Sequence, residues 1–214
     1  TPLVITAHAQ IFYPKGNNSF ALDGQVIERW PNTKKLLNIL KGYTVHFVTG
    51  HTHTIFNALP SETAPLGAEN VFEHNAGSIC ASWWWSGYLT PGVYVSLDGA
   101  PAGYSIWEFA GKDIKWKYKA VGMDENYQFR AYDLNNVSFS YSDVPNISTS
   151  TKVQNAFDYY VKAYPKNSNN EVLINIWNWN SNWKLSVTDE TGKELKWTQT
   201  VAYDPLHIAA LTVK

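Results

Sequence analysis

The stretch TVHFVTGHTH (residues 44–53) joins a strand-like segment to two closely spaced histidines. Residues 44–49 are typical of a β-strand. Gly50 then allows the chain to turn sharply, and His51 and His53 follow in the loop. Because a loop backbone need not alternate between two faces, both imidazoles can turn toward one metal site. This stretch therefore predicts a strand that ends at a loop whose histidines either bind a metal or are ordinary polar loop residues.

A related arrangement precedes it in the sequence. Residues 3–6 (LVIT) form a short apolar run that predicts a buried strand, and His8 follows. Residues 31–41 predict a helix, because Pro31 suits a first turn and the leucines share one face. Gly42 stands in the stop position. The order strand, helix, strand allows a right-handed parallel crossover, with a histidine after each strand.

From about residue 70 onward nearly every predicted element is a strand. Short apolar and aromatic runs separated by turn residues suggest a sandwich. We leave 153–164 open between a helix and an irregular strand, and 142–151 is typical of a linker. The fold class is therefore predicted as mainly β (α+β). The expected strands are 71–74, 78–83, 93–97, 104–109, 114–121, 127–134, 171–177, 183–188, 194–200 and 207–213.

Composition excludes several classes of protein. The chain has 214 residues and is 44% hydrophobic, enough for a core and too apolar for wholesale disorder. It carries 17 basic and 18 acidic residues, so we expect no nucleic acid partner. Residues 74–97 lack charged side chains, but glycine and proline interrupt them, and we expect no membrane span. A single cysteine excludes an internal disulfide.

Several segments resemble the calcineurin-like metallophosphoesterases. VITAH (4–8) and VTGHTH (48–53) are similar to the fourth and fifth motif blocks of that superfamily. Further segments resemble a bacterial subfamily that carries an appended C-terminal β-domain. These segments are residues 73–84, 98–104, 174–187 and 202–207. The resemblance thus extends over nearly the whole chain.

The resemblance implies two-metal hydrolysis of a phosphoester substrate. It implies that His8 and His51 ligate one divalent metal and that His53 ligates the other. Histidine suits Zn, Fe or Ni and accepts Mn. It also implies that residues 1–120 form the C-terminal half of a phosphoesterase sandwich. This half-domain could end as early as residue 66. Residues 121–214 would then form a small β-sandwich-like domain.

Three motif blocks of the superfamily do not occur in this sequence. They are Asp-x-His, Gly-Asp-x-x-Asp and Gly-Asn-His, which supply the bridging carboxylate and most other ligands. We therefore expect a C-terminal portion whose partner is the missing N-terminal half of the same protein. Alone it should bind at most one metal, weakly, and be catalytically inactive. The subfamily resemblance implies a periplasmic or secreted whole protein.

A second group of residues is predicted to shape a substrate cleft. It comprises His74, Trp83, Trp84, Asp98 and Tyr104. A structural hydrogen-bonding role for His74 is an equal alternative, and interior packing is an alternative for the tryptophans.

Two other interpretations remain open. Trp177 and Trp179 would share one face of a regular strand and Asn178 and Asn180 the other, which resembles a glycan-binding surface. A non-catalytic glycan-binding β-module has no need of His8 or the GHTH loop. Strand 3–6 would also leave an unpaired sheet edge, through which a homodimer could form.

Overall fold

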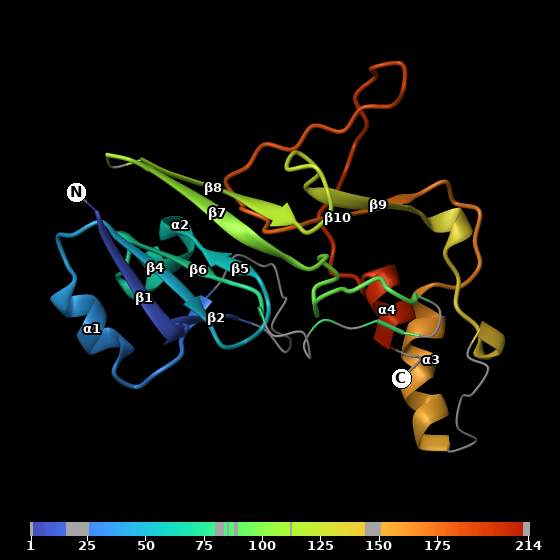
Figure 1. The fold of residues 1–214 in the computed structure, drawn as a ribbon, viewed down its shortest axis with the longest axis horizontal. Coiled ribbons are helices and arrows are strands. Elements are labelled where there is room, and N and C mark those ends of the chain that lie inside the picture. Colours follow the sequence, from blue (N-terminus) through green and yellow to red (C-terminus); the bar gives the residue numbers. More distant parts are fainter. Residues whose placement is uncertain are drawn as a thin grey trace.

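The computed structural model describes residues 2–15, 26–79, 84, 86–87, 90–111, 113–143 and 151–211 (Figure 1). Strands outnumber helices, and the fold is α+β as predicted. Within the described residues, none of the helices combines the length and apolarity that crossing a membrane requires.

The first part of the chain builds a four-stranded sheet in the order β1-β4-β6-β5. Strands β1 (Leu3–Ala9), β4 (Val45–Gly50) and β6 (Val71–Asn75) run parallel, and β5 (Phe56–Ala58) pairs antiparallel with β6. Helix α1 (Thr33–Ile39) lies between β1 and β4 in the chain, so the predicted strand–helix–strand order is confirmed. Shorter elements surround the sheet: β2 (Phe12–Pro14), β3 (Val26–Glu28), α2 (Pro60–Thr63) and η1 (Ala64–Leu66).

Alternate residues of the central strands face opposite sides of this sheet. Val45 and Phe47 of β4 join Val71 of β6 in one apolar core. Leu37 of α1 packs into the same core and is only 3% exposed, which explains the apolar face of the helix. His46 and Phe72 point to the other face, where their rings lie 5.5 Å apart.

A long hairpin lies over that other face (Figure 1). Strands β7 (Gly103–Ala110) and β8 (Asp113–Ala120) pair along their full length, as the sequence predicts. Trp107 and Trp116 stand opposite each other and stack with ring centroids 5.2 Å apart. The ring of Phe72 lies 4.8 Å from that of Trp116, so aromatic packing joins the hairpin to the sheet.

The remainder of the chain forms a smaller ladder and two helices. Strands β9 (Phe129–Asp133) and β10 (Val172–Ile176) pair antiparallel. The segment that the sequence left open is helix α3 (Thr151–Ala163), and α4 (Pro205–Leu211) follows near the end. Two single 3₁₀ turns, η3 (Leu134–Asn136) and η4 (Tyr141–Asp143), lie between β9 and α3.

Several predicted strands are wrong. Residues 207–213 were expected as a strand, but Pro205–Leu211 is a helix whose start is capped by Asp204, which accepts the His207 N–H at 2.8 Å. Segments 93–97, 183–188 and 194–200 form only the isolated bridges Val95↔Pro101 and Thr188↔Glu194. Those segments are largely exposed and lack a neighbouring ladder to join.

Two expectations fall partly outside the described residues. Residues 80–83 of the predicted strand 78–83 lie outside the described residues, and residues 78–79 are not in a strand. Most of the predicted linker 142–151 is likewise not described. The small β-sandwich and the domain boundary at 120, or near 66, stay predictions.

Candidate functional site

Two of the predicted metal ligands meet at one edge of the parallel sheet. His8 lies near the end of β1 and His51 follows β4 directly, so both stand at the carboxyl ends of neighbouring strands. The Nε2 atom of His8 lies 3.0 Å from the Nδ1 atom of His51, and the rings meet edge-on at 4.9 Å. Pairing of β1 with β4 is irregular between Thr6 and Ala9. Such an irregularity changes the direction of a side chain, and here it falls at His8.

The loop after β4 leaves strand geometry. His51 and His53 both have positive φ angles, 76° and 60°, which few residues other than glycine adopt. Backbone strain of this kind is held by its surroundings and clusters at functional sites. The fully buried Asn75 supplies such support, because its Nδ2 donates to Thr52 Oγ1 and to the Thr54 carbonyl, both at 2.5 Å.

The electrostatic surroundings favour a neutral His51. Its pKa lies below the ordinary value because of desolvation, and the nearby charges of Arg29, His8 and His53 lower it further. A neutral imidazole is the form that binds a metal. Arg29 donates to Gln10 Oε1, and its guanidinium lies over the Trp30 ring at 4.4 Å.

The donor set fits part of a metal centre. Two nitrogen ligands about 2 Å from one tetrahedral ion lie roughly 3.3 Å apart. His8 and His51, hydrogen-bonded to each other at 3.0 Å, would reach that spacing with a small movement of the rings. Across the described residues, however, no group of three or more His, Cys, Asp or Glu side chains could hold a metal ion. The assignment of His53 to a second metal stays a prediction.

Glu73 supports the segment that follows His8, and sequence reasoning missed it. The carboxylate is fully buried and accepts the Ile11 N–H, the Phe12 N–H and the Thr49 hydroxyl, each at 2.8 Å. Burial raises the pKa of Glu73 to about 6 in spite of these hydrogen bonds. A lone carboxylate within the otherwise uncharged strand VFEHN (71–75) was the available signal.

His74, predicted to line a substrate cleft, is fully buried between the sheet and the hairpin. Its Nδ1 lies 2.8 Å from Asn57 Oδ1 and its Nε2 lies 3.1 Å from Ser105 Oγ. Burial lowers the pKa of His74 to about 3, so the ring is neutral at ordinary pH. These contacts give His74 the hydrogen-bonding role that the sequence left as an alternative. Substrate contact would require it to be uncovered, and that role stays a prediction.

The other predicted substrate residues are dispersed. Asp98 accepts the Ser96 hydroxyl and, at 3.0 Å, the Ala100 N–H, and burial raises its pKa. Tyr104 is 56% exposed on β7. Trp84 lies beside Gly77, and Trp83 is outside the described residues. Among the residues described, no hydrogen bond or ring contact joins any of them to His8 or His51.

The tryptophans near residue 180 depart from the regular alternation predicted. Asn178 has a φ of 54°, so the chain turns directly after β10. Trp177 is 1% exposed and packs in a core with Tyr118, whereas Trp183 is 38% exposed. A flat strand surface of Trp177 and Trp179 is therefore absent from this part of the described chain.

Comparison with known proteins agrees with the resemblance noted in the sequence. The family described as C terminal of calcineurin-like phosphoesterase matches residues 73–213. This range covers more than half of the chain, and the chain belongs to that family. The match begins at Glu73, so His8, His51 and His53 precede it. No curated protein and no solved structure matches the chain.

Proposed function

We propose that this chain is the C-terminal portion of a metal-dependent phosphoesterase, in which His8 and His51 bind one divalent metal. The observation that carries the proposal is the 3.0 Å separation of His8 Nε2 and His51 Nδ1 at one sheet edge. Family membership supports phosphoester hydrolysis as the activity of the whole protein.

The other parts of the centre would come from an N-terminal part of the same protein. The superfamily motifs that this chain lacks would supply the bridging carboxylate and most other ligands, and His53 would bind the second metal. A bound divalent metal polarises the phosphoryl oxygen and makes hydroxide available at neutral pH. In this chain, the lowered pKa of His51 favours the neutral imidazole that binds a metal, and the nearby charge of Arg29 favours an anionic phosphate.

The free edge of β1 is the proposed contact with that N-terminal part. Strand β1 is the outer strand of the sheet, and Leu3 and Val4 are 36% and 44% exposed. A strand added there would pair with the open backbone groups and cover these side chains. A homodimer formed through the same edge is an alternative proposal. Export to the periplasm or the medium is proposed from the subfamily resemblance alone.

Metal titration of the chain tests the proposal. Calorimetry with Zn²⁺ should show about one site per chain, which His8→Ala and His51→Ala each weaken roughly tenfold or more. His46→Gln is the matched control, because His46 lies on the sheet face beside Phe72. Circular dichroism checks that each variant folds.

Two results would contradict the proposed function. Zn²⁺ affinity that is unchanged in both His8→Ala and His51→Ala would remove the proposed metal site. Phosphodiester turnover by the chain alone with Mn²⁺ or Zn²⁺ would contradict the proposed inactivity of the isolated portion.

A further inference from the structure

The outer edge of β8 carries backbone groups that the β7–β8 hairpin does not use. In an antiparallel pair, the N–H and C=O groups of alternate residues point away from the partner strand. Those of Tyr118 do so, because its N–H donates to Gln128 Oε1 at 3.3 Å and its carbonyl accepts from Gln128 Nε2 at 2.5 Å. The same alternation turns the backbone groups of Trp116 and Ile114 to this outer edge.

The edge is open at Trp116 and Ile114. Within the described residues, neither of them makes a backbone–backbone hydrogen bond outside the β7–β8 ladder. The Gln128 side chain closes only the part of the edge beside Tyr118. An open strand edge is a template on which another strand can pair.

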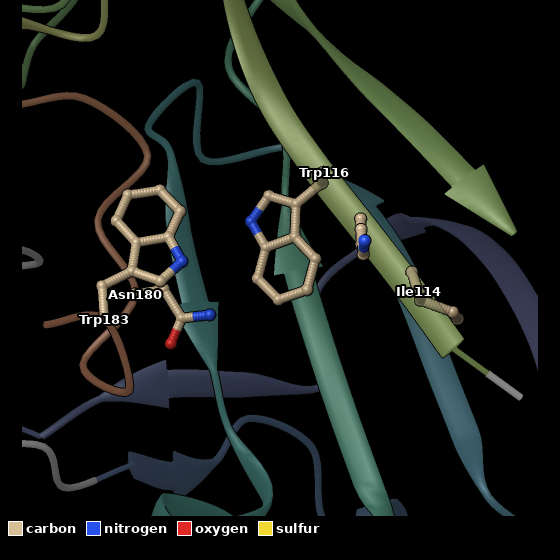
Figure 2. Close-up of a pocket in the computed structure, with 5 residues that line it drawn as sticks. Ile114, Trp116, Asn180 and Trp183 are labelled. Carbon is tan, nitrogen blue, oxygen red and sulfur yellow. The ribbon is translucent and has the colours of Figure 1, made fainter. Parts of the chain in front are cut away.

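A pocket of about 390 Å³ lies along this open edge (Figure 2). The consecutive residues Ile114, Lys115 and Trp116 line one side of it. Because consecutive side chains of a strand point to opposite faces, a space that all three residues share follows the backbone. Asn180 and Trp183, from the segment after β10, line the other side. The volume is within the range of ligand sites, roughly 300–1,000 Å³.

Side-chain donors converge on the same pocket. Figure 2 shows the indole nitrogens of Trp116 and Trp183 on the sides that face each other, with the Asn180 amide nitrogen turned toward the space between them. Asn180 Oδ1 accepts the Asn182 N–H at 2.9 Å, which leaves the Nδ2 hydrogens for a ligand. Trp116 Nε1 is buried and has no partner among the described residues. The pocket therefore favours a ligand with acceptors on the side away from β8.

An extended peptide meets both requirements. A strand has N–H and C=O groups along both of its edges. One edge would pair with Ile114 and Trp116, and carbonyls of the other edge would accept from Asn180 and Trp183. Ile114 and Trp116 are two residue rises apart, about 7 Å, which three residues of an added strand would cover.

The two sides of the pocket are held in place before a ligand arrives. Trp116 is stacked on Trp107 with ring centroids 5.2 Å apart. The Trp183 N–H donates to the Asn180 carbonyl at 2.9 Å. Such preorganisation lowers the entropy cost of binding.

We infer that the outer edge of β8 binds an extended peptide segment as an added antiparallel strand, with a β-branched apolar side chain opposite Trp116. Pairs of aromatic and β-branched side chains stabilise neighbouring strands, and antiparallel pairing is slightly the more stable kind. The next peptide side chain lies on the exposed face with Lys115, where a polar residue is suitable. This mode of binding is β-strand addition, and it is independent of the proposed hydrolytic function.

The test uses the intact chain and the peptide acetyl-Thr-Val-Thr-Val-Thr-amide. NMR of the isotope-labelled chain measures binding and the exchange of backbone amide hydrogens. At nine-tenths occupancy, the amides of Ile114 and Trp116 should exchange about tenfold more slowly than without peptide. The amides of Lys115 and Lys117 face β7 and should exchange as before.

Two changes examine the two edges of the bound peptide separately. Methylation of both valine nitrogens removes the donors that face β8 and should abolish binding. Trp183→Phe keeps an aromatic ring but removes the indole N–H, and it should weaken binding roughly fivefold.

Trp197→Phe is the matched control. Trp197 is also partly exposed, at 47%, and its indole N–H also donates a hydrogen bond, to the Leu185 carbonyl at 3.3 Å, but it does not line the pocket. This variant should bind the peptide as the unchanged chain does.

Four results would overturn the inference: no binding of the peptide, equal binding of its N-methylated form, binding that leaves exchange at Ile114 and Trp116 unchanged, or equal weakening by Trp197→Phe and Trp183→Phe. Slow exchange of these two amides without peptide, together with a dimer in light scattering, would also overturn it, because a second copy of the chain would then cover the edge.

Discussion

The sheet region (β1, β4, β5 and β6 with α1) and the C-terminal region (β7–β10, α3 and α4) are stabilised in different ways. In the sheet region, apolar side chains such as Val45, Phe47 and Val71 form one continuous core. In the C-terminal region, a smaller apolar core around Tyr118 and Trp177 is supplemented by a carboxylate that joins distant segments. Asp204 accepts the Tyr132 hydroxyl at 2.9 Å and the Asn175 amide at 2.8 Å, as well as capping α4.

The two regions should therefore lose stability in different ways when side chains are changed. Burial of apolar surface is distributed over many side chains, and its loss is graded. A buried polar junction depends on each partner, because removal of one leaves the others unsatisfied. The sheet region should therefore respond most to loss of side-chain volume, and the C-terminal region to disturbance of its junctions.

The largest effect is expected in the sheet region. Phe47 is 1% exposed, and Phe47→Ala should lower the free energy of unfolding by about 4 kcal/mol. Urea unfolding followed by circular dichroism measures it. Phe109→Ala, at a side chain that is 53% exposed in the hairpin, should change stability by less than about 1 kcal/mol. Equal losses in the two variants would show that burial of Phe47 in the core contributes no more to stability than an exposed phenylalanine does.

A slightly smaller effect is expected at the junction around Asp204. Gly99 has a φ of 79°, and a Cβ atom there would lie 2.2 Å from Asp204 Cγ. Gly99→Ala should destabilise the protein by about 3 kcal/mol through backbone strain and overpacking.

Gly122→Ala separates these two causes. Gly122 has a φ of 75° and no atom within 4 Å of its Cβ position. Gly122→Ala should therefore lower the free energy of unfolding by about 1 kcal/mol, through backbone strain alone. If both glycine variants unfold at the same urea concentration, the close packing of Gly99 against Asp204 contributes nothing.

The smallest effect is expected from His74, which lies between the two regions and makes the free energy of unfolding depend on pH. The pKa of the folded-state His74 is about 3, below the ordinary 6.5, so as pH falls the unfolded chain takes up this proton first. The stabilising effect of neutral His74 is present above pH 6.5 and is lost below it. Between pH 7 and pH 4.5 the loss should be about 2.5 kcal/mol.

His74→Gln provides the reference for this measurement, because glutamine does not titrate. Unfolding of both proteins at the two pH values isolates the His74 contribution, since the opposing effect of Glu73 is common to both. Parallel pH dependences would show that His74 titrates alike in the folded and unfolded chain.

Most of the sheet region was predictable from sequence, because apolar runs of strand length and a one-sided helix mark its elements. The expected burial of strand 3–6 was wrong, since β1 is an edge strand in which Leu3 and Val4 are 36% and 44% exposed. Strands β1, β4 and β6 and the hairpin lie where they were expected. Helix α4 was missed because residues 207–213 are an apolar run of strand-like length. Pro205 after Asp204 was the contrary signal, since both suit a helix start.

The candidate site was predictable only in part. His8 and His51 were found because each stands at the end of a strand-like run that resembles a motif block of the superfamily. Glu73 was not, because its partners Ile11 and Phe12 lie more than 60 positions away. The pocket between Trp116 of β8 and Trp183, shown in Figure 2, was missed for the same physical reason, since its two sides come from separate segments. No local pattern encodes contacts of this kind.

The amide of Asn57 has a consequence for the order of synthesis. It bonds to residues 178 and 179, which lie 121 and 122 positions further along the chain. On a ribosome, β5 emerges long before those partners exist, whereas the strands of the β7–β8 hairpin emerge almost together. The contact of β5 with the segment around Asn178 and Trp179 can therefore form only after more than 120 further residues have been translated.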